Sequence, residues 1–239
     1  MRIIVSIVLG ISFMVFSCSP QKRISVSLGG EAASPTSLCD SFTIYKSLYI
    51  NKINANMEFE GETYNARLSL YYIPDSVFFI TAVNSGFEIV RLGISRDSFV
   101  YINRLDKLVY IYRDSEMGYP PPILFQDMEN LINRQKICDS GKLSMIEENK
   151  LIVDNSSQDI SKKIYYSSPD LGVVNFEFFQ KKTGEYIVGE KKQEGSFVFY
   201  SNYLIDDVTL EASGGEIEFD RDVSVDLYVN PDKYEIIHL

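Results

Sequence analysis

Apolar and polar side chains alternate along the chain from Ile53 onward, and this alternation constrains the fold more than any other feature. The first run reads Ile53-Asn54-Ala55-Asn56-Met57-Glu58-Phe59-Glu60. A period of two sends successive side chains to opposite faces of a strand, so one face is buried and the other meets water. The pattern recurs at short intervals, separated by turn residues such as Gly61-Glu62 and Pro74-Asp75. These features predict an antiparallel meander.

The predicted strands fall into two groups on either side of a proline-rich segment. The first six are 53–59, 66–72, 77–83, 87–94, 99–103 and 108–112. The later ones are 143–146, 150–153, 163–166, 173–179, 186–191, 197–203, 208–212, 216–219 and 223–229. Gly214-Gly215 is expected to form a hairpin turn. Because no repeat or linker interrupts residues 34–239, we predict a single domain there.

Two segments have helical rather than strand periodicity. Ser34 is a suitable N-cap and Pro35 suits the first helical position. The apolar residues that follow recur at spacings of four, three and four, which predicts a helix through Leu38, Phe42, Tyr45 and Tyr49. Pro120–Pro122 cannot continue a strand ladder, and the apolar spacing behind them predicts a second helix over 123–135. The chain is therefore expected to be mainly β, of the α+β class.

The N-terminus has the pattern of an exported, lipid-anchored protein. Arg2 provides a positive charge, residues 3–16 form a mostly apolar core, and Ser17-Cys18 closes the segment. A small residue followed directly by cysteine resembles the bacterial lipobox, in which the cysteine is acylated and becomes the new N-terminus. An ordinary signal peptide with an incidental cysteine is the alternative. We predict a signal peptide over 1–17, lipidation at Cys18, a flexible tether over 18–33 and a domain over 34–239.

The charge of the chain limits its partners. The full sequence has a net charge of −10, and removing residues 1–17 takes away only Arg2, so the mature charge is −11. Nucleic-acid binding requires clustered Lys and Arg, and it is not expected here. Beyond Cys18 the only cysteines are Cys39 and Cys138, which either pair in an oxidising compartment or remain separate thiols.

No motif in the sequence indicates catalysis. The single histidine, His238, lies in a tail that is expected to fray, and no zinc spacing, Walker loop or Gly-x-Gly-x-x-Gly is present. Asp206-Asp207 and Asp220–Asp222 are the densest acidic groups, and turn carboxylates are the favoured interpretation. A glycosidase pair or a calcium site at those turns stays an alternative. We expect no enzyme activity, no cofactor and no metal.

Residues 86–107 carry a motif of the form Gly-x-Glu-x-x-Arg, then Asp-Ser, then Asn-Arg. Its members are Gly86, Glu88, Arg91, Asp97, Ser98, Asn103 and Arg104. This motif and the order of predicted elements resemble an uncharacterised family of Bacteroidetes lipoproteins that is similar to the lipoprotein carrier LolA and the receptor LolB. The resemblance covers about residues 38 to 235. It implies an incomplete antiparallel β-barrel wrapped around a few helices, with an apolar cavity for acyl chains.

The alternating faces supply candidates for the lining of such a cavity: Met57, Phe59, Leu68, Leu70 and Phe79. An open barrel either accepts an apolar guest or fills itself with side chains, and residue type does not distinguish the two. Glu88 and Arg91 lie three apart on a strand, so a direct ion pair is not expected. Each is predicted to pair with a neighbour such as Arg104 or Asp97, in a structural role. Tyr119 to Phe125 either imitates the receptor's membrane-contacting loop or simply leads into the second helix.

Three functions follow from these features. The leading one is a monomeric lipoprotein that binds an acyl chain of a lipoprotein or a lipid. The second is a structural or interaction lipoprotein with a filled core, and the third is a carboxylate-dependent hydrolase. Ser19 differs from the Asp that retains enterobacterial lipoproteins at the inner membrane, and Lys22-Arg23 is basic rather than acidic. We therefore expect an anchor in the outer membrane and a domain that faces the periplasm.

Overall fold

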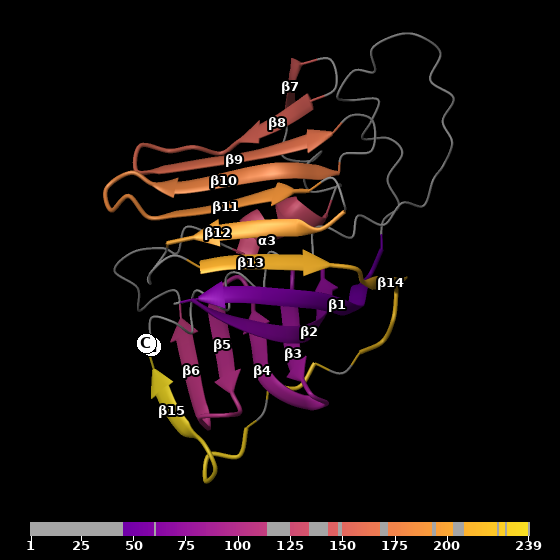
Figure 1. The fold of residues 1–239 in the computed structure, drawn as a ribbon, viewed down its shortest axis with the longest axis vertical. Coiled ribbons are helices and arrows are strands. Elements are labelled where there is room, and N and C mark those ends of the chain that lie inside the picture. The colour runs from indigo at the N-terminus through magenta and orange to yellow at the C-terminus, as the bar shows by residue number, and fades with distance from the viewer. Residues whose placement is uncertain are drawn as a thin grey trace.

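The structure, a computed structural model, describes residues 45–59, 61–113, 125–133, 143–147, 150–167, 172–192, 195–202, 208–223, 225–227 and 229–238. In these residues fifteen strands form one sheet, and an eight-residue helix, α3, lies behind it (Figure 1). The signal peptide, the tether, Cys18, Cys39, Cys138 and Asp206-Asp207 lie outside the described residues, as do residues 119–124. The described helix is too short to cross a membrane.

The first half of the sheet is the predicted meander. Its strands are β1 (Leu48–Phe59), β2 (Glu62–Ile73), β3 (Val77–Asn84), β4 (Phe87–Ile94), β5 (Ser98–Asn103) and β6 (Leu108–Arg113). Each strand pairs antiparallel with the next. All six predicted strands are confirmed. The alternation of apolar and polar side chains located them, because a half-buried strand has one buried face and one face in water.

The second half is also antiparallel. Its strands are β7 (Leu143–Glu147), β8 (Lys150–Asp154), β9 (Ile160–Ser167), β10 (Val173–Gln180), β11 (Tyr186–Lys191), β12 (Phe197–Ser201) and β13 (Val208–Ser213). β13 pairs with β1 and so joins the halves, while β15 (Glu235–His238) adds to β6 in parallel. The path from β15 to β7 does not close on itself among the described strands. The sheet is thus open, which agrees with the expected incomplete barrel. One helix is described, so "a few helices" stays a prediction.

Gly214-Gly215 does not form the predicted hairpin turn. β13 and β14 (Glu216–Phe219) both pair with β1, on either side of the glycines, so they continue along the same edge. Opposite the glycines, β1 has an irregularity between Ile50 and Ile53, and Lys52 has a φ of 57°. Gly214 and Gly215 also have positive φ. The pair therefore lets β13–β14 follow a bend in β1, which a local turn signal cannot reveal.

Two further predictions are wrong in part. The helix expected to run to Tyr49 does not do so, because Leu48 and Tyr49 belong to β1 and the described residues 45–47 are not helical. The described residues of 223–229 form no strand, and the last strand is instead β15. His238 pairs with Ile111 in that strand, so the tail does not fray before it. Leu227 packs against Gly93 on the surface of the sheet, and the described residues around it form no strand.

Candidate functional site

The concave face of the sheet is apolar and covered. A row of side chains crosses the first six strands through directly paired positions: Ile50, Leu70, Ile80, Leu92, Tyr101 and Tyr110. All six belong to the main hydrophobic core. Leu68 and Leu70 lie in this core with 1% and 0% of their surfaces exposed. Met57 is partly buried and packs against it. The side chain of Phe59 lies outside the described residues.

Phe79 lies on the opposite face from the other cavity candidates. Its neighbours Phe78 and Ile80 belong to the concave core, whereas Phe79 is paired with Tyr71 and Gly93 and is outside that core. The Arg91 guanidinium lies 5.7 Å from the centre of its ring. The expected inward direction of Phe79 is therefore wrong. β3 is apolar on both faces, so its period could not show which residues face the interior.

α3 (Phe125–Ile132) lies against the concave face and is buried on its polar as well as its apolar side. Phe125, Met128 and Leu131 join the hydrophobic core, and the Phe125 ring meets Phe78 edge-on at 5.0 Å. Asp127 and Glu129 are 6% and 3% exposed. Carboxylates this deeply buried require hydrogen-bonding partners in the surrounding protein.

Glu129 supplies the contact between α3 and the first half of the sheet. Its Oε1 accepts hydrogen bonds from the Tyr72 hydroxyl and from the Asp75 amide, both at 2.8 Å. The Asn133 side chain donates to the Tyr72 oxygen at 3.3 Å. Burial, together with the nearby Glu129 charge, raises the pKa of Tyr72 well above its ordinary range. The Tyr72 hydroxyl therefore stays protonated at neutral pH and remains a donor to Glu129.

Asp127 and Asn130 connect α3 to the second half. Lys162 Nζ of β9 lies 2.5 Å from Asp127 Oδ2, and both side chains are about nine-tenths buried. The hydroxyl of Tyr166, also on β9, donates a hydrogen bond to the Asn130 carbonyl at 3.0 Å. Burial raises the pKa of Tyr166 well above the ordinary value, so this donor also stays protonated. α3 therefore contacts both halves of the sheet, which the β1–β13 pairing also joins.

An aromatic cluster fills part of the concave face of the second half. It consists of Phe176, Phe178, Phe197 and Phe199, each no more than 2% exposed. Neighbouring rings lie 5.1 to 6.0 Å apart. Gly189 leaves room for them, since a Cβ there would lie 2.3 Å from Phe176 Cε1. The sequence signal for this cluster was the repeated Phe at alternate positions, which does not distinguish a filled core from a lined cavity.

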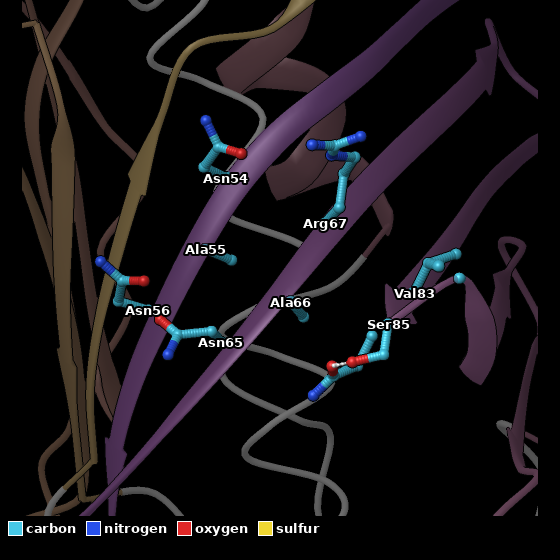
Figure 2. Close-up of a pocket in the computed structure, with 10 residues that line it drawn as sticks. Asn54, Ala55, Asn56, Asn65, Ala66, Arg67, Val83 and Ser85 are labelled. Carbon is cyan, nitrogen blue, oxygen red and sulfur yellow. Dashed lines mark hydrogen bonds between the residues drawn. The ribbon is translucent and has the colours of Figure 1, made fainter.

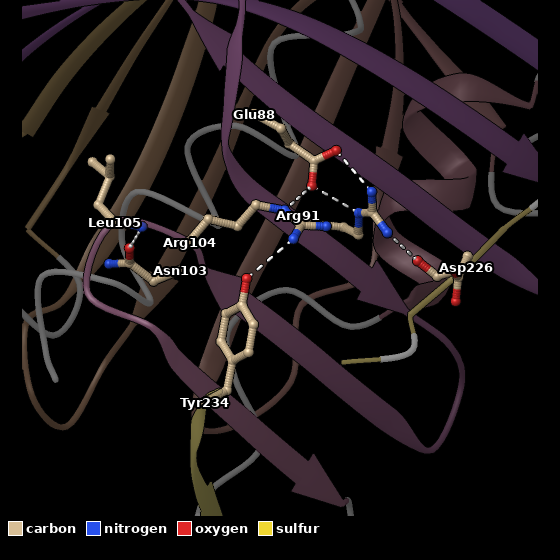
Figure 3. Close-up of polar contacts among 7 residues, drawn as sticks. All are labelled: Glu88, Arg91, Asn103, Arg104, Leu105, Asp226 and Tyr234. Atoms are coloured by element: carbon tan, nitrogen blue, oxygen red, sulfur yellow. Dashed lines mark hydrogen bonds and ion pairs between the residues drawn. The ribbon is translucent and has the colours of Figure 1, made fainter. Parts of the chain in front are cut away.

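Three of the motif residues, Glu88, Arg91 and Arg104, meet on the convex face. Glu88 accepts two hydrogen bonds from Arg91, both at 2.8 Å, and one from Arg104 Nε at 2.6 Å (Figure 3). The expected pairing with Arg104 is confirmed, but the direct Glu88–Arg91 pair was wrongly excluded. The β3–β4 register shifts between Ala82 and Val83, and this bulge places Glu88 on the same face as Arg91. Asp97 instead accepts a hydrogen bond from Ser95.

Both arginines also hold the C-terminal segment. Arg91 Nη1 donates to the Asp226 carbonyl at 2.7 Å, and Arg104 Nη1 donates to the Tyr234 hydroxyl at 3.1 Å (Figure 3). A Cβ on Gly93 would lie 2.4 Å from the Leu227 side chain, so the segment packs closely on β4. Burial alone would raise the pKa of Glu88, but hydrogen bonds and charge from the two arginines outweigh it and lower that pKa. We call Glu88, Arg91, Arg104 and Tyr234 the convex clasp.

The remaining motif residues shape turns. Gly86 has a φ of 83° between β3 and β4, where a side chain would be strained. Ser98 hydrogen-bonds Ser95 across the β4–β5 turn. Asn103 Oδ1 accepts from the Leu105 and Asp106 amides in the turn before β6. The motif thus encodes tight turns and a clasp. Among the described residues, no group of three or more metal-binding side chains meets.

The fold and site define an open, mainly antiparallel sheet with a helix buried against one of its faces. No protein-family model matches the sequence, and no curated protein matches it. Among solved structures, a DUF1329 family protein from Desulfovibrio piger has a TM-score of 0.42 at 10% identity, covering 80% of this chain and 93% of its own.

Two further structures are similar to the same degree. One is a putative outer membrane lipoprotein-sorting protein domain from Vibrio parahaemolyticus, with a TM-score of 0.42, 9% identity and coverage of 74% of this chain and 87% of its own. The other is a LolA superfamily protein from Nitrosomonas europaea, with a TM-score of 0.42, 8% identity and coverage of 82% and 96%. The motif at residues 86–107 resembles an uncharacterised lipoprotein family that is itself similar to LolA and LolB.

Proposed function

We propose that this protein is an outer-membrane lipoprotein, anchored through Cys18 and facing the periplasm, whose half-barrel binds an acyl chain between the sheet and α3. The observation that carries the acyl-binding proposal is the position of α3. An apolar helix face, made by Phe125, Met128 and Leu131, occupies the concave side of a sheet that does not close. Such a surface accepts an apolar guest in place of the helix face that covers it.

The polar contacts between α3 and the sheet support the proposal that this helix can be displaced. Besides its apolar contacts, it is attached to the sheet by Glu129 on one side and Asp127 on the other. The Asp127–Lys162 ion pair returns little net stability, because the desolvation of two buried charges offsets much of their attraction. Displacement of α3 would uncover Phe78, which the Phe125 ring contacts. Leu68 and Leu70 belong to the same hydrophobic core and Met57 packs against it, and these three are the inner residues expected to line the cavity.

The experiment uses the full chain carrying Cys18→Ser, so that no attached acyl chain interferes. The proposal predicts uptake of a fluorescent fatty acid and a bound lipid in native mass spectra. Met57→Asp should weaken this uptake, because the half-buried side chain faces the interior. Leu105→Asp is the matched control, since Leu105 is 71% exposed in a turn and the same charge there should change nothing. Absence of both uptake and bound lipid in the folded protein would contradict acyl binding.

Anchoring is tested separately. An alkyne-bearing fatty acid fed to cells should label the wild-type protein, and Cys18→Ser should abolish both the label and the membrane association. Unchanged labelling of the variant would contradict lipidation at Cys18.

A filled scaffold is the second candidate, and the burial of the interior favours it. Leu68, Leu70 and the four clustered phenylalanines are almost completely covered. In that case the domain would present its outer surface to a partner in the envelope and bind no lipid. Failure of the uptake experiment with normal membrane association would select this function.

A further inference from the structure

A cleft of about 570 Å³ is lined by residues of β1, β2 and the β3–β4 turn. Its four larger polar side chains on β1 and β2 are exposed and lie on the face opposite the hydrophobic core. Two directly opposed cross-strand pairs form its base: Asn54 with Arg67, and Asn56 with Asn65 (Figure 2). Ala55 and Ala66 separate the two pairs along the strands. Two residues of strand span about 6.7 Å, so four polar groups stand in a square array. The β3–β4 turn, through Ser85 and Gly86, bounds one side.

The four polar side chains of this array have no hydrogen bond or ion pair with other described residues. Arg67 is the cationic member. Val83 on β3 is paired with Arg67 on one side and with Glu88 on the other, so Glu88 is the candidate partner across β3. Glu88 is already bound by Arg91 and Arg104. Among the described residues, no carboxylate therefore neutralises the Arg67 guanidinium, although the chain has a net charge of −10.

The charges around the array are unequal, and this restricts the ligand. Glu211 on β13 is paired with Asn56, which puts a carboxylate beside the corner of the array diagonal to Arg67. A polyanion would be repelled at that corner. A ligand with one anionic group, placed at Arg67, and uncharged polar groups over the asparagines would match the array. Amide side chains both donate and accept hydrogen bonds, as hydroxyl groups require.

We propose that this cleft binds a sugar that carries a carboxylate. The Arg67 guanidinium binds the carboxylate in a two-pronged hydrogen-bonded pair. The amides of Asn54, Asn56 and Asn65 bind hydroxyl groups of the sugar ring. A volume of about 570 Å³ is within the usual range for small-ligand sites. The acidic sugar belongs either to an envelope glycan or to a free oligosaccharide, and both present the same chemistry.

Calorimetric titration of the full-length protein tests the proposal. Digalacturonic acid should bind, and neutral lactose should bind about tenfold more weakly or not at all, because it lacks the charged group. Arg67→Gln should weaken digalacturonate binding about tenfold or more, and Asn65→Ala should weaken it less. Arg96→Gln is the matched control: Arg96 is also exposed but pairs with Asp75, away from the cleft. All of these residues are exposed, so the variants should fold.

Three results would overturn the proposal: no binding of digalacturonate at millimolar concentration, equal loss in Arg96→Gln and Arg67→Gln, or inorganic phosphate binding as tightly as the disaccharide. Competition with purified lipopolysaccharide distinguishes the two sources. Displacement of the disaccharide at a lower concentration of lipopolysaccharide indicates an envelope glycan, and a lack of displacement indicates a free oligosaccharide. The cleft does not depend on acyl binding, so either proposal can fail without the other.

Discussion

Glu88 shows how one side chain can hold distant parts of the chain together. It neutralises two arginines, and each arginine also binds the C-terminal segment, at Asp226 or Tyr234. Its side chain is 24% exposed, so these contacts are only partly screened by solvent. The sequence identified the residues of this clasp, and the structure identified what they hold.

Glu88→Gln should lower the free energy of unfolding by about 1–3 kcal/mol at neutral pH, because it removes charge-assisted hydrogen bonds. The folded pKa of Glu88 is lowered, so its contribution is present above the unfolded value of about 4.3 and is lost as the pH falls through the folded value. The difference between variant and wild type should therefore shrink below about pH 4. Urea unfolding across pH measures it, with exposed Glu58→Gln as control. A difference independent of pH would contradict this role.

Gly189→Ala should destabilise the protein by about 1–3 kcal/mol through overpacking. The added methyl group would lie 2.3 Å from Phe176 and 2.6 Å from Phe197, whose rings are locked in the core. Gly93→Ala is the comparison, because its methyl group would meet only the end of the Leu227 side chain, which can rotate. Thermal unfolding should show the larger loss for Gly189→Ala. Equal losses of stability in the two variants would mean that the rings of the aromatic cluster shift as easily as the Leu227 side chain.

At the scale of elements, α3 is unusual because its polar residues are buried. Its sequence predicted an amphipathic helix with one wet face, and 123–135 contains the described helix. The structure instead covers both faces, since Lys162 and Tyr72 supply partners from two distant strands. Their positions 35 and 57 residues away made this pairing invisible in the local pattern.

Lys162→Met should cost about 3–5 kcal/mol, because it leaves the Asp127 carboxylate buried without its cation. The double variant Asp127→Leu/Lys162→Met should recover most of that loss, since apolar side chains of similar size need no partners. Chemical denaturation of the two variants and of Asp127→Leu gives the coupling energy. A double variant as unstable as Lys162→Met alone would show that the pair is not the main reason for the loss.

At the scale of the whole molecule, the end strands of the open sheet have fewer neighbouring strands than its centre. β15 contributes four residues in parallel pairing, and β7 lies at the other end of the path. β1 is the centre, where β2, β13 and β14 all pair with it. Stability should therefore be highest at the junction of the halves.

Hydrogen–deuterium exchange should show this gradient. Amides of β1 and β2 should exchange slowest, and amides of β15 and β7 fastest, because the end strands open without disrupting the core. Tyr234→Phe should speed exchange in β15 but not in β7, since it removes the hydrogen bond from Arg104 only at that end. Uniform protection across the sheet would contradict the expected order.

The sequence by itself determined where most strands lie, that the sheet is mainly antiparallel, and which residues form the motif turns. Those features depend on neighbours in the chain, through the period of two and through residues such as Gly86. Only the tertiary structure decided the direction of Phe79, the bulge that joins Glu88 to Arg91, the role of Gly214-Gly215 and the course of the C-terminal segment. Each of these depends on which distant strand lies alongside, and a strand with two apolar faces or one extra residue gives no local sign of that choice.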